Sequence, residues 1–299
     1  MDEQQTQTLS YFREFAAQWR QKALGALPDK VNIIEQRNAF ARMVAAELDS
    51  PARALDVGCG SGELVCDLAR CGLRTLGVDF SPEMIALCEQ KAEAEGVEGA
   101  EFIAASIFDT QLETGAYDLI VANGFIEYIS PEDMLRFFGD VHRALKPRGA
   151  FVVGSRNRLF NAFSLNAFTE MEQRMGAFDA LVAESIGLCA SESMQACIDA
   201  LSGSNDALPV AERHPATEVK VETRHQYTPS QLVKELDRIG FDVVELYPLH
   251  YHGVPPAFGR AHPKLHVAMA ELVQVFARGE HRLLPFASSF MAHASRRAD

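Results

Sequence analysis

A glycine-rich turn between a short apolar strand and an amphipathic helix is the part of the sequence best suited to bind a ligand. The strand is predicted over 54–57, and the turn contains Gly58, Gly60 and Gly62. Glycine lets the backbone approach a ligand closely, and the N–H groups at the start of the helix point toward it. Asp79 ends the next apolar strand, where a carboxylate can accept hydrogen bonds from ribose hydroxyls. This combination predicts a nucleotide-like ligand.

Two carboxylates beside the turn select among such ligands. Asp56 directly precedes the turn, and Glu63 follows it, at the position where a dinucleotide site has Gly or Ala. Two carboxylates repel a pyrophosphate, but they attract a cation. S-adenosylmethionine (SAM) shares ribose and adenine with NAD and carries an ammonium and a sulfonium instead of phosphates. The charges therefore favour SAM over NAD, and the alternative is a plain turn that binds nothing.

Charge and composition argue against several classes of function. The 299 residues contain 28 Lys and Arg against 41 Asp and Glu, which gives a formal net charge of −13. This charge disfavours nucleic acids and anionic membrane surfaces as partners. We expect no membrane span, because no apolar stretch reaches the roughly 20 residues needed, and no signal peptide. Six cysteines without a CxxC pair indicate reduced thiols, so we expect a cytoplasmic protein without a metal site.

Short apolar strands alternate with amphipathic helices, which predicts an α/β fold with a parallel sheet covered on both faces. Ser81, Ser130 and Thr228 are each followed by proline, the combination typical of a capped first helical turn. The strands are expected over 54–57, 75–78, 102–105, 118–122, 151–153, 241–246 and 289–294. We predict four segments: an N-terminal helical cap (1–50), a ligand-binding core (51–157), a helical insertion (158–226) and the completion of the α/β core (227–299).

The insertion at 158–226 is rich in Phe and Met. An insertion after the fifth strand emerges near the carboxyl edge of the sheet, where ligands bind in such folds. This position favours a lid over an acceptor with apolar parts. An additional packed subdomain and a dimer contact are the alternatives.

The motifs together resemble those of the class I SAM-dependent methyltransferases, over 50–157 and 226–295. The resemblance rests on the segments 56–62, 77–81, 117–124 and 145–149. It implies a Rossmann-like, doubly wound, mostly parallel seven-stranded sheet with an antiparallel last strand, N-terminal helices and a helical insertion after the fifth strand. It also implies that Asp79 binds the ribose of SAM and Phe80 its adenine.

The opening segment is similar to small-molecule O-methyltransferases of the ubiquinone-biosynthesis type, through Tyr11, Phe12, Trp19, Asn32 and Arg37. By that resemblance Arg37 pairs with the carboxylate of SAM; a solvated helix face is the alternative. Where the family often has an acid after the third strand, this sequence has Ser106. The expected cofactor contacts are Tyr11, Arg37, Asp56, Gly58, Cys59, Gly60, Asp79, Phe80, Met84, Ser106, Ile107, Asn123 and Gly124.

On the acceptor side, a general base helps if the acceptor is a hydroxyl or an ammonium. The candidates follow predicted strands or end the insertion: His250, His252, Glu127, Tyr128 and His225. The first two alternate on an extended segment and therefore share a face, and their neutral pKa suits proton abstraction. A pair of surface histidines is the alternative. A metal pair is not expected, because no third ligand stands out nearby and the segment 262–266 is interpreted as a helix start.

The sequence thus predicts a SAM-dependent methyltransferase that acts on a small-molecule acceptor, at oxygen. Nitrogen or carbon is the alternative acceptor atom. The competing classes are a NAD(P)-dependent oxidoreductase, which Asp56 and Glu63 disfavour, and a SAM-binding regulatory protein without catalysis. A homodimer is left open.

Overall fold

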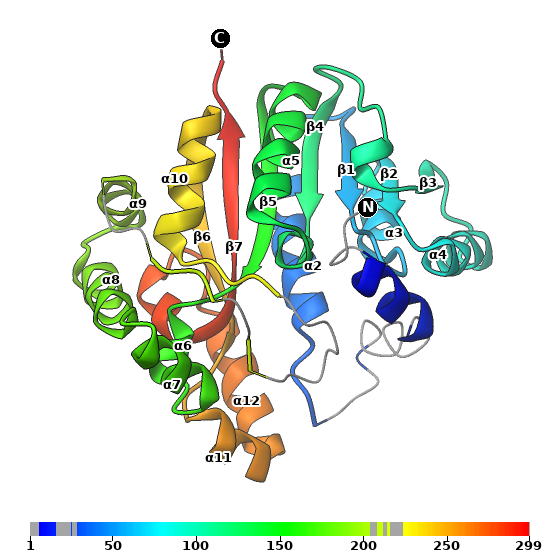
Figure 1. Ribbon diagram of the computed structural model, residues 1–299. Coiled ribbons are helices and arrows are strands. Elements are labelled where there is room, and N and C mark those ends of the chain that lie inside the picture. Colours follow the sequence, from blue (N-terminus) through cyan, green and yellow to red (C-terminus); the bar gives the residue numbers. More distant parts are fainter. Residues whose placement is uncertain are drawn as a thin grey trace.

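The computed structural model describes residues 6–15, 25, 29–203, 208–211, 214–215 and 224–298. It contains a seven-stranded sheet with the strand order β3-β2-β1-β4-β5-β7-β6 (Figure 1). β7 runs antiparallel to β5 and β6, and the other strand pairs are parallel. The strands are β1 Arg53–Val57, β2 Arg74–Asp79, β3 Ala100–Ala104, β4 Tyr117–Ala122, β5 Leu145–Arg156, β6 Phe241–Tyr251 and β7 Ala287–Arg296. The predicted fold class is confirmed.

The helices of the core begin where the capping signals predict. Ser81 and Ser130 accept hydrogen bonds from the backbone N–H groups three residues later, and Thr228 forms a capping box with Gln231. Such caps satisfy N–H groups that have no partner within the helix. The core helices are α2 Ile33–Ala45, α3 Glu63–Arg70, α4 Pro82–Ala94, α5 Pro131–Ala144, α10 Pro229–Ile239, α11 Pro256–Ala261 and α12 Pro263–Gln274, with 3₁₀ turns η1 Ile107–Asp109, η2 Ile126–Tyr128 and η3 His281–Phe286.

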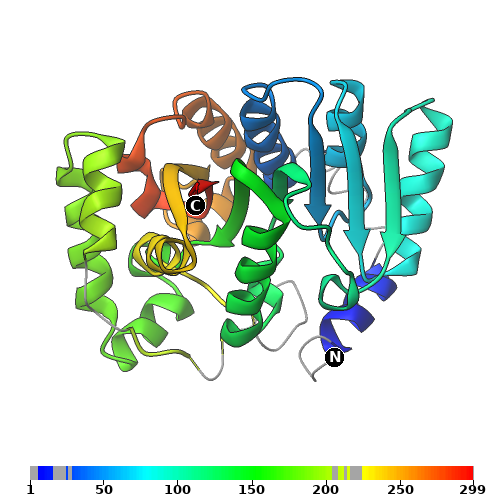
Figure 2. The ribbon, with the colours of Figure 1, turned by 90° about the horizontal axis from the view of Figure 1, so that it is seen from above.

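Helices cover both faces of the sheet (Figure 2). One face carries α5 and α10, whose apolar side chains form a cluster with Phe151 and Phe241 of the strands. On the other face, α2 and α3 pack through Phe40 and Leu68. The central parallel strands β1 and β4 are therefore buried on both sides, whereas the edge strand β3 is partly exposed. No helix among the described residues is long and apolar enough to cross a membrane.

The insertion begins with four helices: α6 Phe160–Phe163, α7 Ala167–Arg174, α8 Phe178–Ala190 and α9 Met194–Ser202. They lie at the β6 end of the sheet, opposite β1 to β3, in both views (Figures 1 and 2). Their apolar side chains join the same cluster as α10 and β6. An ion pair between Arg158 and Glu172, whose side chains are 6% and 0% exposed, connects the first part of the insertion internally. These helices therefore extend the core.

Residues 6–15 form an opening helix. Tyr11 is buried and packs on Phe12, with ring centroids 5.4 Å apart, and Phe12 in turn packs on Tyr128 at 5.3 Å. The opening helix is thereby attached to the turn after β4. Trp19, which the sequence comparison also singled out, lies outside the described residues.

Candidate active site

The turn between β1 and α3 adopts a conformation that favours glycine. Gly58, Gly60 and Gly62 have φ angles of +70°, +55° and +80°, and a left-handed backbone costs other residues roughly 1–2 kcal/mol each. The backbone N–H of Gly60 donates to a carboxylate oxygen of Asp79 at 3.1 Å. A Cβ atom built on Gly60 would have no neighbour within 4 Å. The outer side of the turn at Gly60 therefore faces open space.

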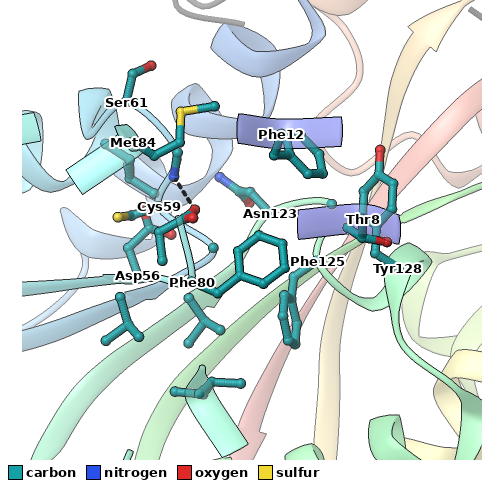
Figure 3. Close-up of a pocket in the computed structure, with 18 of the residues that line it drawn as sticks. Thr8, Phe12, Asp56, Cys59, Ser61, Phe80, Met84, Asn123, Phe125 and Tyr128 are labelled. Atoms are coloured by element: carbon teal, nitrogen blue, oxygen red, sulfur yellow. Dashed lines mark hydrogen bonds between the residues drawn. The ribbon is translucent and has the colours of Figure 1, made fainter. Parts of the chain in front are cut away.

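That space is a pocket that is partly open to solvent. It lies at the carboxyl ends of β1, β2 and β4, at the point where the strand order reverses, which is where ligands bind in open α/β sheets. Asp56, Cys59 and Met84 line one side, and Thr8, Phe12 and Tyr128 line the other (Figure 3). The predicted contacts that line it are Arg37, Asp56, Gly58, Cys59, Gly60, Asp79, Phe80, Met84, Ser106, Ile107, Asn123 and Gly124.

Tyr11 is the member of the predicted contact set that does not line the pocket. Its neighbour Phe12 does, and Tyr11 packs behind it. Residues 11 and 12 point to different sides of one helix. The aromatic signal in the opening segment was thus useful, but the side chain that faces the pocket is Phe12.

Carboxyl groups with unsatisfied oxygens gather at the turn. Asp56 and Asp79 are 5% and 8% exposed. Burial, with Asp79 and Glu63 nearby, raises the pKa of Asp56 to about 7. Burial raises the pKa of Asp79 to about 6, although the N–H groups of Ser81 and Gly60 act in the opposite direction. One oxygen each of Asp56, Glu63 and Asn123 is buried without a hydrogen-bond partner among the described residues.

Buried polar atoms rarely remain unpaired. Three unpaired oxygens around one pocket therefore indicate a ligand that brings hydrogen-bond donors and positive charge.

The remainder of the pocket is largely aromatic. The rings of Phe80, Phe108 and Phe125 line it together with those of Phe12 and Tyr128. The rings of Phe12 and Phe80 meet edge-on with centroids 6.5 Å apart, and those of Phe108 and Phe125 are 6.4 Å apart. Such rings stack on flat apolar groups. The pocket thus offers aromatic rings against which planar apolar groups can pack.

Three arginines surround one glutamate below the pocket. Glu127 is 1% exposed and forms ion pairs with Arg37, at 3.0 Å, and with Arg224. Burial alone would raise the pKa of Glu127, but Arg224 and Arg37 outweigh it and hold this pKa below its usual value. Burial and then Arg224 lower the pKa of Arg156 to about 10. With one carboxylate for three guanidinium groups, this cluster carries excess positive charge.

Arg37 connects this cluster to the pocket. Its guanidinium also donates to the hydroxyl of Ser289 at 2.9 Å, and it lies so close to Gly124 that a Cβ atom there would collide with it. Arg37 lines the pocket and its Nε is buried without a partner among the described residues. These contacts argue against the alternative of a solvated helix face.

The predicted base candidates divide into two groups in space. Tyr128 lines the pocket, and Glu127 precedes it. His225 does not line the pocket, but its backbone N–H donates to the carbonyl oxygen of Glu127 at 2.8 Å, so this histidine lies beside the pocket residues. Burial raises the pKa of Tyr128 to about 12 and lowers the pKa of His225.

His250 and His252 lie in a different part of the structure. Neither lines the pocket, because β7 lies between β5 and β6 and thereby moves β6 to the edge of the sheet. Four strand spacings of about 4.8 Å, or about 19 Å, separate β6 from β1. β6 also extends five residues beyond its predicted end, through pairing of Tyr251 with Ala287. The two histidines instead meet His266 of α12.

The N-terminal segment contributes more to the pocket than predicted. Ile34, Arg37 and Asn38 of α2 all line it, at the spacing of one helix face. That spacing was a signal in the sequence, whereas Thr8 carried none. Arg224 was also missed, because nothing local distinguishes it. No residue of 158–203 lines the pocket, so the predicted lid, if formed, depends on the remainder of the insertion, which the structure describes only in part.

A family model described as a methyltransferase domain matches residues 54–149. The demethylmenaquinone methyltransferase of Thermus thermophilus is 36% identical over 107 residues, which is 35% of this chain and 47% of that protein. The ubiquinone biosynthesis O-methyltransferase of Xanthomonas oryzae pv. oryzae is 33% identical over 128 residues, 41% and 51% of the two chains. The chain therefore spans about half the length of the relatives it matches.

Solved structures with the same fold cover nearly the whole chain. The magnesium protoporphyrin IX methyltransferase of Synechocystis PCC 6803, with bound S-adenosylhomocysteine (SAH), superposes with a TM-score of 0.56, 15% identity, and coverage of 98% of this chain and 100% of that one. A putative methyltransferase of Haloferax volcanii gives a TM-score of 0.57 at 14% identity, with coverage of 96% and 98%. The comparisons thus identify residues 54–149 as a methyltransferase domain, in a chain that has the fold of SAM-dependent methyltransferases.

Proposed function

We propose that this protein binds SAM and transfers its methyl group to an oxygen atom of a small aromatic acceptor. The observation that supports SAM most strongly is the group of buried carboxyls at the glycine turn, with unpaired oxygens on Asp56 and Glu63. The SAM ammonium can satisfy them, whereas a pyrophosphate would be repelled. Asp79, at the end of β2, is the group proposed for the ribose hydroxyls, and Phe80 for the adenine.

The residues that would hold SAM include a positively charged partner for its carboxylate. When bound, SAM supplies an activated methyl group on a sulfonium. Arg37 lines the pocket with an unpaired Nε, so it can bind the SAM carboxylate, as the resemblance of the opening segment implies. Phe12 and Thr8 of the opening helix help to exclude water from the pocket, which strengthens electrostatic interactions inside it.

Two observations support an aromatic oxygen acceptor. Rings of Phe12, Phe108, Phe125 and Tyr128 line the pocket, and one relative is named as an O-methyltransferase of ubiquinone biosynthesis. Excess positive charge around Glu127 further favours an acceptor with an anionic group. Methylation at nitrogen or carbon, and SAM binding without catalysis, are the alternatives that the experiments below separate.

For the base we propose His225. Burial lowers its pKa, so the ring is neutral at pH 7 and can accept a proton. Glu127 is a weaker candidate, because its ion pairs with two arginines lower its pKa and make the carboxylate less basic. His250 and His252 are separated from the turn by most of the sheet width. We also propose a cytoplasmic location, with which six free cysteines agree. The homodimer and the lid stay predictions.

Titration calorimetry with SAM, SAH and NAD tests the cofactor proposal. We expect SAM and SAH to bind with one molecule per chain and NAD to give no heat. Incubation with methyl-labelled SAM and a panel of phenols, with and without carboxylates, then tests transfer. Label in an O-methyl product supports the proposal, label at nitrogen or carbon favours the first alternative, and binding without transfer to any acceptor favours the regulatory one.

Asp79→Ala should weaken SAM binding at least about tenfold, because charge-assisted hydrogen bonds contribute roughly 1.5–3 kcal/mol each. Asp79 also accepts from the N–H groups of Ser81 and Gly60, so the alanine variant alone could alter the turn. Asp79→Asn is the matched variant, since it keeps one side-chain oxygen and loses the charge. Both are measured by calorimetry, with circular dichroism as the check on folding. An unchanged dissociation constant would show that the ribose is held elsewhere.

SAM affinity should fall as the pH decreases. In the free protein the pKa of Asp56 is raised to about 7 and that of Asp79 to about 6. A cation favours their ionised forms, so the affinity is highest above pH 7 and is lost as both groups become protonated below it. Between pH 8 and pH 6 we expect about a tenfold loss. Asp56→Asn should flatten most of this dependence, and a native protein whose affinity is the same at both values would contradict the assignment.

A further inference from the structure

Three histidine rings converge at the edge of the sheet, away from the pocket. His250 lies at the end of β6, His252 follows it, and His266 comes from α12. The ring centroids lie 4.3 to 5.1 Å apart. One nitrogen atom from each ring can be chosen so that all three lie within 4.8 Å of one another. Residues from two separate elements are thus brought to one point.

The ring nitrogens of this cluster are poorly satisfied. Both nitrogens of His252 and Nδ1 of His266 are buried and have no hydrogen-bond partner among the described residues. The remaining nitrogen of His266 shares a hydrogen bond of 2.9 Å with Nε2 of His250. In that bond one ring donates its N–H and the other accepts with its lone pair. Buried unpaired nitrogens are costly, and three of them in one cluster indicate a missing partner.

His250 is oriented by its surroundings. The hydroxyl of Ser288 is 2.9 Å from its Nδ1, which leaves Nε2 directed toward the other two rings. Its backbone N–H donates to the side chain of Gln36 at 2.9 Å. Its φ angle is +54°, a conformation that costs a residue with a side chain and is often found at functional sites. A metal-binding histidine usually donates its second ring N–H to an acceptor that fixes the ring, and the Ser288 hydroxyl oxygen can act as that acceptor.

We propose that His250, His252 and His266 bind a divalent transition metal of the Zn²⁺ class. Imidazole nitrogens are typical Zn²⁺ ligands at about 2.0–2.1 Å, and two such ligands in a tetrahedral shell lie about 3.4 Å apart. The present spacing, 2.9 Å for one pair and below 4.8 Å for all, requires only small ring movements. Three protein ligands leave a fourth position for water or another small ligand.

This proposal differs from the sequence analysis, which predicted no metal site. A metal site was not expected because no third ligand stood out near His250 and His252. The structure supplies that ligand from α12, whose first turn begins at Pro263 and carries His266 on the side facing the strand end. The site does not involve the glycine turn, although Gln36, which accepts from the backbone N–H of His250, precedes the pocket residue Arg37.

Calorimetry with ZnCl₂ on the untagged, chelator-treated full chain tests the proposal. We expect one Zn²⁺ per chain, and a Co²⁺-substituted protein with the visible absorption of tetrahedral coordination by nitrogen and oxygen. His252→Ala and His266→Gln should each weaken Zn²⁺ at least about 100-fold. Ser288→Ala, which removes only the orienting hydroxyl, should weaken it about 10-fold to 100-fold.

His262→Ala is the matched control, because this histidine precedes the same helix but is not part of the cluster. It should bind Zn²⁺ like the native chain. SAM calorimetry on the same variants shows whether the pocket is intact, so failure of the metal proposal is distinguishable from failure of the proposed function. Two results would overturn the proposal: a native chain that binds no stoichiometric Zn²⁺, or Co²⁺ spectra with thiolate bands, which would assign binding to the exposed Cys71 or Cys189.

Discussion

Gly60→Val is expected to eliminate measurable SAM binding, a loss of at least about 100-fold, while the protein remains folded. In the structure, Gly60 has φ +55° and its Cβ direction points into open space at the pocket. A valine there would fill part of the volume that the ligand requires, and its branched side chain resists a positive φ. Calorimetry measures the affinity, and thermal unfolding measures the accompanying loss of stability.

Backbone strain and steric exclusion can be separated with a second glycine. Gly96 has φ +60°, its Cβ direction is equally open, and it lies beyond the far end of α4 without lining the pocket. Gly96→Val should therefore cost similar stability and leave SAM affinity unchanged. Gly60→Ala should fall between the native protein and Gly60→Val. If Gly60→Val bound SAM like the native protein, the turn would not face the ligand.

His225→Ala is expected to lower the rate of methyl transfer by about 10²–10⁴-fold, the usual contribution of a general base, with little change in SAM affinity. The reason is position: the backbone of His225 is bonded to that of Glu127, next to the pocket residue Tyr128. Single-turnover rates measure the chemical step, and calorimetry measures the cofactor affinity. Added imidazole should restore part of the rate.

The pH profile and a second variant make this test specific. Burial lowers the pKa of His225, so the native rate should rise with pH below neutrality and then level off, and His225→Ala should lose that limb. Burial raises the pKa of Tyr128 to about 12, so its phenol stays protonated near pH 7. Tyr128→Phe should therefore cost less than about tenfold. A normal rate in His225→Ala would leave orientation of the substrates as the main source of catalysis.

Local sequence signals predicted the helix caps and most of the residues that line the pocket at the glycine turn. Ser81, Ser130 and Thr228 were predicted as helix caps and do accept the expected hydrogen bonds. The glycine turn and Asp79 were predicted together, and a hydrogen bond joins Gly60 to Asp79. These features depend on residues that are close in the chain or on two adjacent parallel strands, so composition and spacing carry the information.

The acceptor side and the metal cluster depend on contacts between distant segments. Arg37, Glu127 and Arg224 come from α2, from the turn after β4 and from the end of the insertion. His266 reaches His250 only because β6 extends to Tyr251 and α12 folds back against it. No local sequence pattern predicts such contacts between distant segments.

Strand order decided where the last histidines lie. Both β6 and β7 were predicted as strands, but β7 inserts between β5 and β6 and moves His250 away from the glycine turn. Periodicity along the chain predicts that a strand forms and which of its faces is buried. Which strand it pairs with depends on the packing of the whole sheet and its helices. Only the tertiary structure could therefore separate the pocket from the histidine cluster.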